Sequence, residues 1–352
     1  MEKLHKQRKL FAVLLAALLT LSGLIPLPRA SAAAGGEELA GLAGASSLRE
    51  LLDRRLARRL AEGSAQTPGE AGEAGEAVQA EDPAPAAVPE KVPPAGSPSA
   101  TDILAAAQTI AHGMGEIDGV TTLNCLEGFL ENYAKGVRVF EVDLRLTADG
   151  RVVLRHDWRG GWQEGVNESA IPTLEDFLAK PILEKYTPLS FQDLLLLLDE
   201  YPDVAVITDS KYTDTDVAVV QFGAMMADAR ELGLSYVFDR IIVQFYSQDM
   251  RDALHNAYGY SHYIYTLYNE GFGGTEDAFR TLAAYCAKNG VEGITMWDSW
   301  WKPAFAPIAQ EYGVRVYVHT VNDPAPAREL LASGVSAVYS DSLSGAELNP
   351  GA

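Results

Sequence analysis

The most constraining feature of the chain is an alternation of short β-rich runs and helical patterns from Thr109 to Asp341. Eight runs can form buried strands: TIAH (109–112), VRVFEVD (137–143), VAVITD (204–209), RIIVQF (240–245), HYIYTL (262–267), EGITMW (292–297), RVYVHT (315–320) and SAVYSD (336–341). Such alternation is typical of α/β proteins with a parallel sheet. Eight strands in roughly 250 residues predict a (β/α)8 TIM barrel. An open doubly wound sheet is the alternative, but HGMGEIDG after the first run lacks the GxGxxG spacing.

The segment FEVDLRLTADGRVVLRHD (140–157) interrupts this alternation. Only a turn separates its two β-rich halves, and a parallel crossover needs far more chain, so we predict a β-hairpin inserted after the second strand. A two-residue turn at positions 149–150 places His156 opposite Asp143. A one-residue change in the loop places it opposite Val142. In either register the histidine lies near the acidic end of the strand.

Acidic side chains gather where two neighbouring strands are predicted to stop. Glu141 and Asp143 share one side of their strand, and Asp209 ends the next strand. The C-terminal strand ends of a barrel meet on one face, and carboxylates this close repel unless a proton or a cation lies between them. Oxygen ligands of this kind suit Mg²⁺ or Ca²⁺. The alternative is that Glu141 and Asp143 are solvated or pair with Arg138 and Arg145.

Two histidines flank the predicted cation site, namely His112 at the end of the first run and His156 on the hairpin. A single histidine at a strand end is more often structural than catalytic. A pair beside a divalent cation can serve as general acid and general base near neutral pH. Gln244 and Trp297 also end strands, and we expect them to face the substrate.

These residues lie in segments that resemble a known family. In order, IAHG, NCLEGF, FEVDLRLTADGRVVLRHD, ITDSK, IIVQF, VYVHTVND and GVSAVYSD resemble the signature segments of the glycerophosphodiester phosphodiesterase family, in the phosphatidylinositol-specific phospholipase C-like superfamily. The resemblance implies a TIM barrel that hydrolyses phosphodiesters with a divalent metal ion. It also implies that the two histidines are the acid and base pair, that the three acids are metal ligands, and that Lys211 contacts phosphate.

Three segments depart from the family pattern. The family's HRG is HGM at 112–114, so an arginine expected to contact phosphate is absent, and Arg155 and Arg159 are candidates to replace it. Its ExK is DSK at 209–211, and its WTVN is HTVN at 319–322. The departures leave the predicted reaction unchanged and affect the choice of head group.

We therefore expect an exported, metal-dependent hydrolase that cleaves glycerophosphodiesters, or related lipid head-group phosphodiesters, to an alcohol and a phosphomonoester. One alternative is a phospholipase C- or D-like enzyme acting on a phosphoinositide or sphingolipid, and another is a non-catalytic binding module of the cell envelope. The net charge of −20 repels nucleic acid and anionic lipid surfaces. The expected partner is a small-molecule phosphodiester, and the oligomeric state is left open.

The composition divides the chain into three parts. Residues 1–32 have the basic start, apolar run and small terminal residues of a secretory signal peptide. We expect no transmembrane span in the mature chain, and a location that is secreted or extracytoplasmic, free or held by the cell envelope. Residues 33–100 are of low complexity and are expected to be mostly disordered, with a short amphipathic helix at 47–60. The phosphodiesterase TIM-barrel domain is expected over 101–346.

Overall fold

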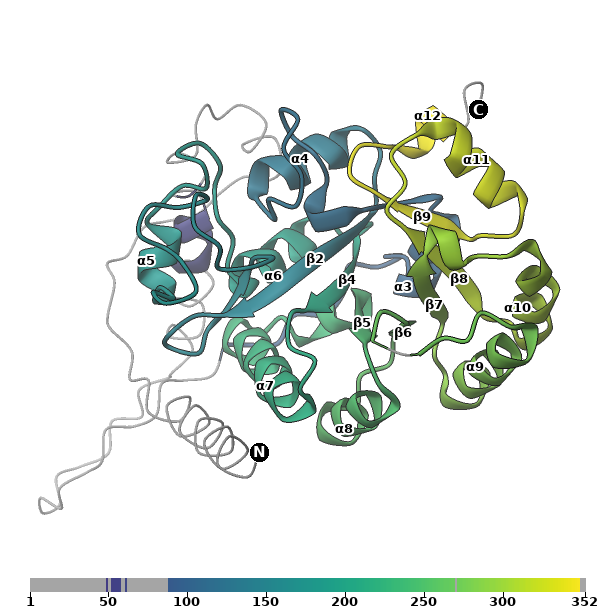
Figure 1. The fold of residues 1–352 in the computed structure, drawn as a ribbon. Coiled ribbons are helices and arrows are strands. Elements are labelled where there is room, and N and C mark those ends of the chain that lie inside the picture. The colour runs from purple at the N-terminus through teal and green to yellow at the C-terminus, as the bar shows by residue number, and fades with distance from the viewer. Residues whose placement is uncertain (1–48, 50–51, 58–60, 62–87, 270, 349–352) are drawn as a thin grey trace, which may run out of the picture.

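The computed structural model describes residues 49, 52–57, 61, 88–269 and 271–348, and the predicted signal peptide lies outside them (Figure 1). A nine-stranded sheet has the order β1-β9-β8-β7-β6-β5-β4-β2-β3. Strand β1 also pairs with β2, and this pairing closes a ring of parallel strands. Strand β3 (Val152–Leu154) lies outside the ring. The ring strands are β1 (Thr109–Ala111), β2 (Val139–Leu146), β4 (Ala205–Ser210), β5 (Ile241–Phe245), β6 (Tyr263–Thr266), β7 (Gly293–Trp297), β8 (Arg315–His319) and β9 (Ala337–Ser340). This ring confirms the predicted (β/α)8 barrel.

Helices connect the ring strands and surround the barrel (Figure 1). Ser190 caps the start of α6, and Gly233 ends α7 in the left-handed conformation that glycine adopts without strain. The helices are α3 (Ala100–Ala106), η2 (His112–Met114), α4 (Leu126–Ala134), α5 (Leu174–Leu178), α6 (Phe191–Glu200), α7 (Thr215–Leu232), η3 (Ser235–Arg240), α8 (Gln248–Tyr258), α9 (Glu276–Asn289), η4 (Asp298–Trp300), η5 (Pro303–Phe305), α10 (Ala306–Tyr312), α11 (Pro324–Ala332) and α12 (Gly345–Leu348).

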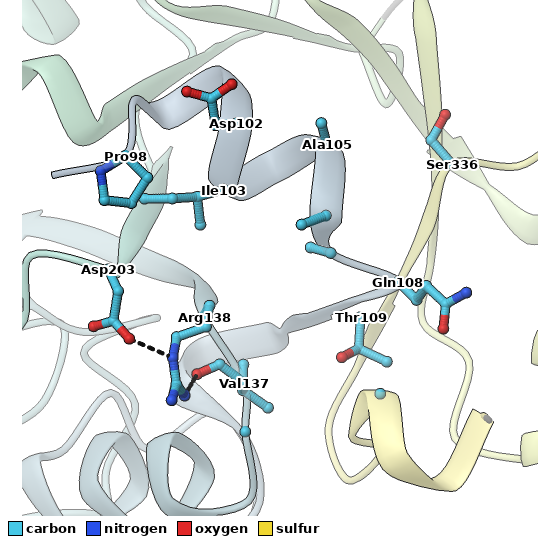
Figure 2. A pocket seen from close by; sticks show the side chains of 14 residues that line it. Pro98, Asp102, Ile103, Ala105, Gln108, Thr109, Val137, Arg138, Asp203 and Ser336 are labelled. Carbon is cyan, nitrogen blue, oxygen red and sulfur yellow. Dashed lines mark hydrogen bonds and ion pairs between the residues drawn. The ribbon is translucent and has the colours of Figure 1, made fainter. Parts of the chain in front are cut away.

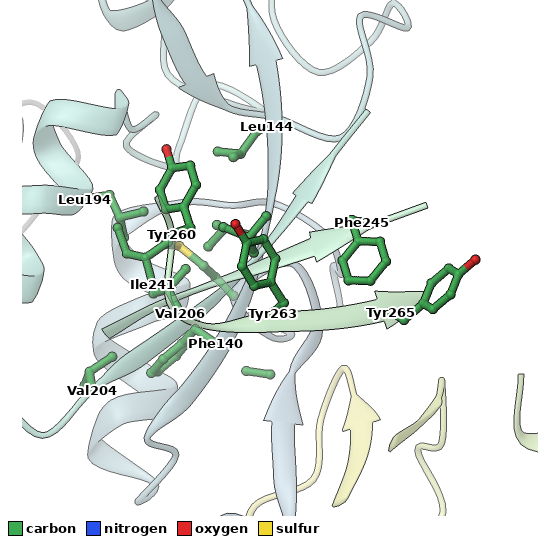
Figure 3. Close-up of a cluster of buried hydrophobic side chains, with 14 of the residues drawn as sticks. Phe140, Leu144, Leu194, Val204, Val206, Ile241, Phe245, Tyr260, Tyr263 and Tyr265 are labelled. Carbon is green, nitrogen blue, oxygen red and sulfur yellow. The ribbon is translucent and has the colours of Figure 1, made fainter. Parts of the chain in front are cut away.

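Strand β2 packs the core with one face and presents acids with the other. Phe140 and Leu144 belong to the hydrophobic cluster between the sheet and the surrounding helices, part of which Figure 3 shows. Val139 belongs to the separate cluster that also contains strand residues from around the ring. Successive side chains of a strand point to opposite faces, so Glu141 and Asp143 share the inner side with Val139. The alternation explains why two charged residues lie in an otherwise apolar strand.

The hairpin forms after the second barrel strand, but its register differs from the two-residue turn that we predict. Leu144 lies opposite Leu154 in the antiparallel pair of β2 and β3. Continuing this register places His156 across from Val142 rather than Asp143. The prediction of the turn is therefore wrong by one residue, and the alternative register is the observed one.

Local hydrogen bonds explain the longer turn. The Thr147 N–H donates to the Arg151 carbonyl at 2.9 Å, and the Gly150 N–H donates to the Thr147 carbonyl at 3.0 Å. The loop thus has three residues, 148–150, and Gly150 has a φ of 76°. A three-residue loop that ends on a left-handed glycine is a common hairpin geometry. The Thr147 hydroxyl also donates to Asp149 at 2.5 Å, which favours this loop over the two-residue turn.

Helix α3 covers the N-terminal end of the barrel, where Ile103 packs into the inner cluster. A cavity of about 710 Å³ lies beside this helix, and its lining includes Thr109, Arg138 and Asp203 (Figure 2). The Arg138 Nε lies 2.7 Å from an Asp203 carboxylate oxygen. These residues begin or precede their strands, whereas His112 follows β1, Asp209 lies one residue before the end of β4 and Trp297 ends β7. The cavity therefore lies at the opposite end of the barrel from the predicted site.

Among the described residues that precede the barrel, 49, 52–57 and 61 are helical. Leu52 is fully buried and belongs to the hydrophobic cluster that contains Phe140 and Leu144 of β2. The remaining positions of the helix predicted over 47–60 lie outside the described residues. Within the part of the chain that the structure describes, no helix combines the length and apolarity needed to cross a membrane.

Candidate active site

Three buried carboxylates meet at the C-terminal end of the barrel. Glu141 and Asp143 come from β2, and Asp209 comes from β4, where it lies directly opposite Asp143 in the parallel register. One oxygen of each carboxylate lies within 4.8 Å of the others. The structure thus brings together the three acids that the sequence predicts as metal ligands. We call this group the acid triad.

The alternative pairing of these acids with arginines is not what the structure shows. Arg138 pairs with Asp203 at the other end of the barrel. Arg145 donates from Nε to the His156 carbonyl at 3.1 Å. Its guanidinium also lies 5.5 Å from the centre of the Tyr212 ring. Neither arginine neutralises the acid triad in the described structure.

Three residues that sequence reasoning missed hold the triad in place. The Asn124 side chain donates to Asp143 Oδ2 at 2.6 Å and accepts from the Asp143 N–H at 2.9 Å. The Gly113 N–H donates to Glu141 Oε2 at 2.7 Å. The Tyr246 hydroxyl donates to Asp209 Oδ1. Asn124 lies within the quoted NCLEGF segment, which is the signal that pointed to it.

Excess negative charge dominates the electrostatics of the triad. Burial and the neighbouring Asp143 raise the pKa of Glu141 to about 8. Burial also raises the pKa of Asp143, but the positive charge of Lys211 lowers it by more. The pKa of this carboxyl is therefore below its ordinary range. Glu141 Oε1 is buried and has no hydrogen-bond partner among the residues that the structure describes. An unpartnered buried carboxylate oxygen beside two further carboxylates fits an oxygen-coordinated divalent cation, so the acid triad could bind a metal ion.

Lys211 supplies the positive charge next to the triad. Its ammonium lies 2.5 Å from Asp143 Oδ1 and also contacts Asp209 Oδ2. Burial lowers the pKa of Lys211, but the two aspartates raise it more, so the side chain is charged at any physiological pH. A fixed cation at this rim suits an anionic ligand in a protein with a net charge of −20.

Each of the two predicted histidines is paired with a carboxylate through Nδ1. His112 Nδ1 lies 2.8 Å from Asp341 Oδ1, and His156 Nδ1 lies 2.9 Å from Asp157 Oδ2. Asn322 donates to the second Asp341 oxygen at 2.7 Å and so fixes its orientation. A carboxylate on Nδ1 leaves the other ring nitrogen of a histidine for proton transfer. Neither aspartate was predicted from the sequence, although Asp341 directly follows β9 and Asp157 directly follows His156.

The two histidines differ in their electrostatic environment. Burial lowers the pKa of His112, but Asp341, Glu141 and Asp143 raise it more, to about 9. His112 is therefore protonated at neutral pH. The His156 side chain is more open, with 40% of its surface exposed against 28% for His112. The geometry suits His112 as a proton donor and the more accessible His156 as a proton acceptor.

The two arginines proposed to replace the missing one have other roles. Arg155 donates to the Asp157 carbonyl at 2.6 Å, and its guanidinium lies 5.0 Å from the centre of the Trp162 ring. Arg159 is 74% exposed and pairs with the Asp157 side chain at 3.1 Å. Both arginines therefore support the partner of His156. In the described structure Lys211, rather than either arginine, contacts the triad.

Trp297 and Gln244 occupy different parts of the site. Trp297 is 45% exposed, and its ring lies 4.4 Å from that of His319 and 5.2 Å from that of Tyr268. Gln244 is buried on β5 and accepts from the Tyr339 hydroxyl at 3.4 Å. Trp297 thus forms an exposed aromatic wall, whereas Gln244 is buried.

His319 is a histidine near the site that cannot act as a proton donor. Burial, together with the positive charges of His112 and Lys211, lowers the pKa of His319 to about 3. Its Nε2 is buried without a hydrogen-bond partner among the described residues. The ring is therefore neutral at neutral pH.

The fold and the site together define a TIM barrel with a buried acidic group that could bind a metal ion at the C-terminal end of its strands. The model of the glycerophosphoryl diester phosphodiesterase family matches residues 119–344, and the chain belongs to this family. A comparison with curated protein sequences gives no match.

Solved structures of several organisms share the fold. A candidate glycerophosphoryl diester phosphodiesterase from Silicibacter pomeroyi is 20% identical, with a TM-score of 0.55 over 67% of this chain and 90% of that one. A glycerophosphodiester phosphodiesterase from Parabacteroides distasonis is 16% identical, with a TM-score of 0.53 over 66% and 92%. A phosphodiesterase from Oleispira antarctica, solved with the product sn-glycerol-3-phosphate, is 15% identical, with a TM-score of 0.54 over 66% and 92%.

Proposed function

We propose that the protein is an exported, metal-dependent phosphodiesterase that hydrolyses glycerophosphodiesters to an alcohol and a phosphomonoester. The observation that carries the proposal is the juxtaposition of the acid triad and Lys211 with two histidines that are each paired with a carboxylate. Family membership and the Oleispira antarctica structure with sn-glycerol-3-phosphate support the same substrate class. The signal-like sequence of residues 1–32 supports a secreted or extracytoplasmic location.

In the proposed mechanism, Glu141, Asp143 and Asp209 would hold Mg²⁺ or Ca²⁺, and the bound cation would supply Lewis-acid stabilisation of negative charge on the phosphate. Lys211 neutralises a phosphate oxygen. His156 accepts the proton of the attacking hydroxyl, which belongs to water or to a neighbouring group of the substrate. In the second case the cyclic phosphodiester that forms is opened by water to give the phosphomonoester. His112 donates its proton to the leaving alcohol oxygen.

Two other functions fit the sequence less well once the structure is considered. An interfacial lipase needs an apolar surface, yet only four large hydrophobic residues among those described are exposed, namely Val92, Ile171, Leu183 and Trp297. A binding module has no need for two histidines with oriented carboxylate partners. The arrangement of charges favours catalysis on a soluble diester.

A substrate panel tests the proposal directly. We expect the protein to release alcohol and phosphomonoester from glycerophosphodiesters, with turnover lost on chelation and restored by Mg²⁺ or Ca²⁺. Turnover confined to lipid substrates would support the phospholipase-like alternative. Absence of turnover with every substrate and cation would support the binding module. Product release is measured enzymatically and by phosphorus NMR.

Substitution of Asp341 by asparagine tests the assignment of His112 as the acid. The activity of a general acid is present while it is protonated and is lost as the pH rises through its pKa. Without the Asp341 charge the pKa of His112 falls, so the high-pH limb of the kcat profile is expected to move down by about one pH unit or more. An unchanged high-pH limb would show that His112 is not the group that limits activity there.

A further inference from the structure

The residues that precede the barrel make a buried ionic contact with it. Arg49 donates from both guanidinium ends to Asp193 in the first turn of α6, with NH1 to Oδ2 and NH2 to Oδ1 distances of 2.7 Å each. Arg49 also donates to the Pro188 carbonyl at 3.4 Å. The Asp193 side chain is fully buried, and that of Arg49 is 13% exposed. A two-pronged contact of this kind is the strongest geometry for an arginine and a carboxylate.

A second contact holds the same segment farther along α6. Arg55 pairs with Glu200, the last residue of that helix, and Leu52 is fully buried between the two anchors in sequence. Arg49 and Arg55 are six residues apart, and their partners Asp193 and Glu200 are seven apart on α6. These separations correspond to about 9 and 10 Å along a helix axis. Residues 49 and 52–57 therefore run alongside α6 in the same direction. We call these residues the leader helix.

The chain contacts α6 again where it approaches the barrel. The Lys91 ammonium lies 2.6 Å from Asp199 Oδ2, and the Lys91 N–H donates to the Gly233 carbonyl at 2.9 Å. The Ser235 hydroxyl and Glu90 are 2.7 Å apart. Segments on both sides of residues 62–87 are thus bound to the same side of the barrel, which makes the leader helix part of the catalytic domain.

The contact at Arg49 connects to the hairpin that carries His156. Asp193 Oδ2 also accepts from the Ser190 N–H at 2.8 Å and from the Ser190 hydroxyl at 2.7 Å. Ser190 bridges to Val153 of β3, and the Leu154 N–H donates to the Leu189 carbonyl at 2.9 Å. Leu154 lies two residues before His156. Arg49 thus neutralises the carboxylate that orders residues 188–190, and these residues form the support on which β3 lies.

We propose that Arg49 is a positioning residue for His156, acting through Asp193 and the 188–190 segment. The expected change in kcat rests on the proposed function, whereas the expected change in structure does not. Loss of the guanidinium leaves a fully buried carboxylate without its counter-charge, and such a carboxylate is strongly unfavourable. The first turn of α6 and the adjoining β3 then shift, and His156 loses its alignment.

The test compares Arg49→Ala with Arg55→Ala in the full chain. Each substitution removes one arginine–carboxylate pair between the leader helix and α6, but Glu200 lies at the far end of α6 from β3. Arg49→Ala also removes the pair of Arg49 with the exposed Asp53 carboxylate at 2.9 Å. We expect Arg49→Ala to lower kcat roughly 10-fold to 10²-fold with little change in KM, because small misplacements of a catalytic group have effects of this size. We expect Arg55→Ala to lower the melting temperature while kcat is retained, and Arg49→Lys, which keeps the charge, to recover part of the activity.

Hydrogen exchange supplies a readout that does not depend on activity. The amides of residues 152–156 are expected to exchange faster in Arg49→Ala than in the wild type, and to be unchanged in Arg55→Ala. Equal effects of both substitutions on kcat and on exchange, or no effect of Arg49→Ala on either, would overturn the proposal. If the wild type hydrolyses no diester, the proposed function fails, and the exchange comparison alone decides the positioning role. If Arg49→Ala does not fold, Arg49→Lys takes its place in both measurements.

Discussion

Substitution of His156 by alanine is expected to lower kcat by roughly 10²- to 10⁴-fold, the range typical of a lost general base. The residue lies at the open end of the barrel, with Nδ1 held by Asp157. It packs little against the core, so the folded state should keep its stability. Steady-state kinetics on a glycerophosphodiester, with circular dichroism as a check of folding, measure the effect.

His262→Ala is the matched control for that substitution. His262 is also a histidine paired through Nδ1 with a carboxylate, that of Glu292, but it precedes β6 at the other end of the barrel. We expect its removal to leave kcat unchanged. Full activity in His156→Ala, or equal losses in both variants, would show that His156 does not transfer the proton.

Substitution of Glu141 by glutamine is expected to lower kcat by roughly 10²-fold or more, the scale of a lost electrostatic contact to a transition state. The same change should abolish stabilisation by divalent cations. A cation at 100 times its Kd stabilises the native wild type by about 2.7 kcal/mol. Burial and Asp143 raise the pKa of Glu141, so a neutral side chain should make the cation-free protein more stable. Thermal unfolding with and without Mg²⁺ or Ca²⁺ measures both effects.

Asp203→Asn serves as the control for the cation experiment, because Asp203 pairs with Arg138 at the opposite end of the barrel. It removes the same charge from the protein and should leave the cation-dependent shift intact. If the cation shifted the thermal unfolding of Glu141→Gln as much as that of the wild type, the acid triad would not be the metal site.

The barrel and the acid triad were predictable because both follow from local patterns. Alternating β-rich and helical runs specify the number of strands, and the barrel geometry brings their C-terminal ends together. Glu141, Asp143 and Asp209 lie at or near the ends of predicted strands, so their proximity could be predicted without knowing any particular contact. The two histidines followed from the same argument and from the hairpin.

The residues that orient the catalytic groups were less predictable because their contacts join distant parts of the chain. Asp341 reaches His112 across 229 positions, and Tyr246 reaches Asp209 across 37. No periodicity links such pairs, although Asp341 follows a strand and could have been considered on that ground. Arg155 and Arg159 show the converse limit. Their positive charge suggested a phosphate contact, but both side chains interact with Asp157 instead.

The leader helix illustrates a third limit. Its spacing of leucines among arginines predicts an amphipathic helix but does not say which surface it covers. That choice depends on a buried carboxylate at position 193, which in the sequence looks like an ordinary helix-capping residue. The pairing of Arg49 with Asp193 appears only when α6 is placed beside the barrel.

The three-residue loop of the β2–β3 hairpin has a consequence for how this protein can vary. Because side chains alternate along β3, the number of loop residues determines which of Arg155 and His156 faces the rim. Substitutions at 148–150 change local stability, whereas a single insertion or deletion exchanges the two side chains. Selection for activity should therefore tolerate changes in the identity of these residues far better than changes in their number.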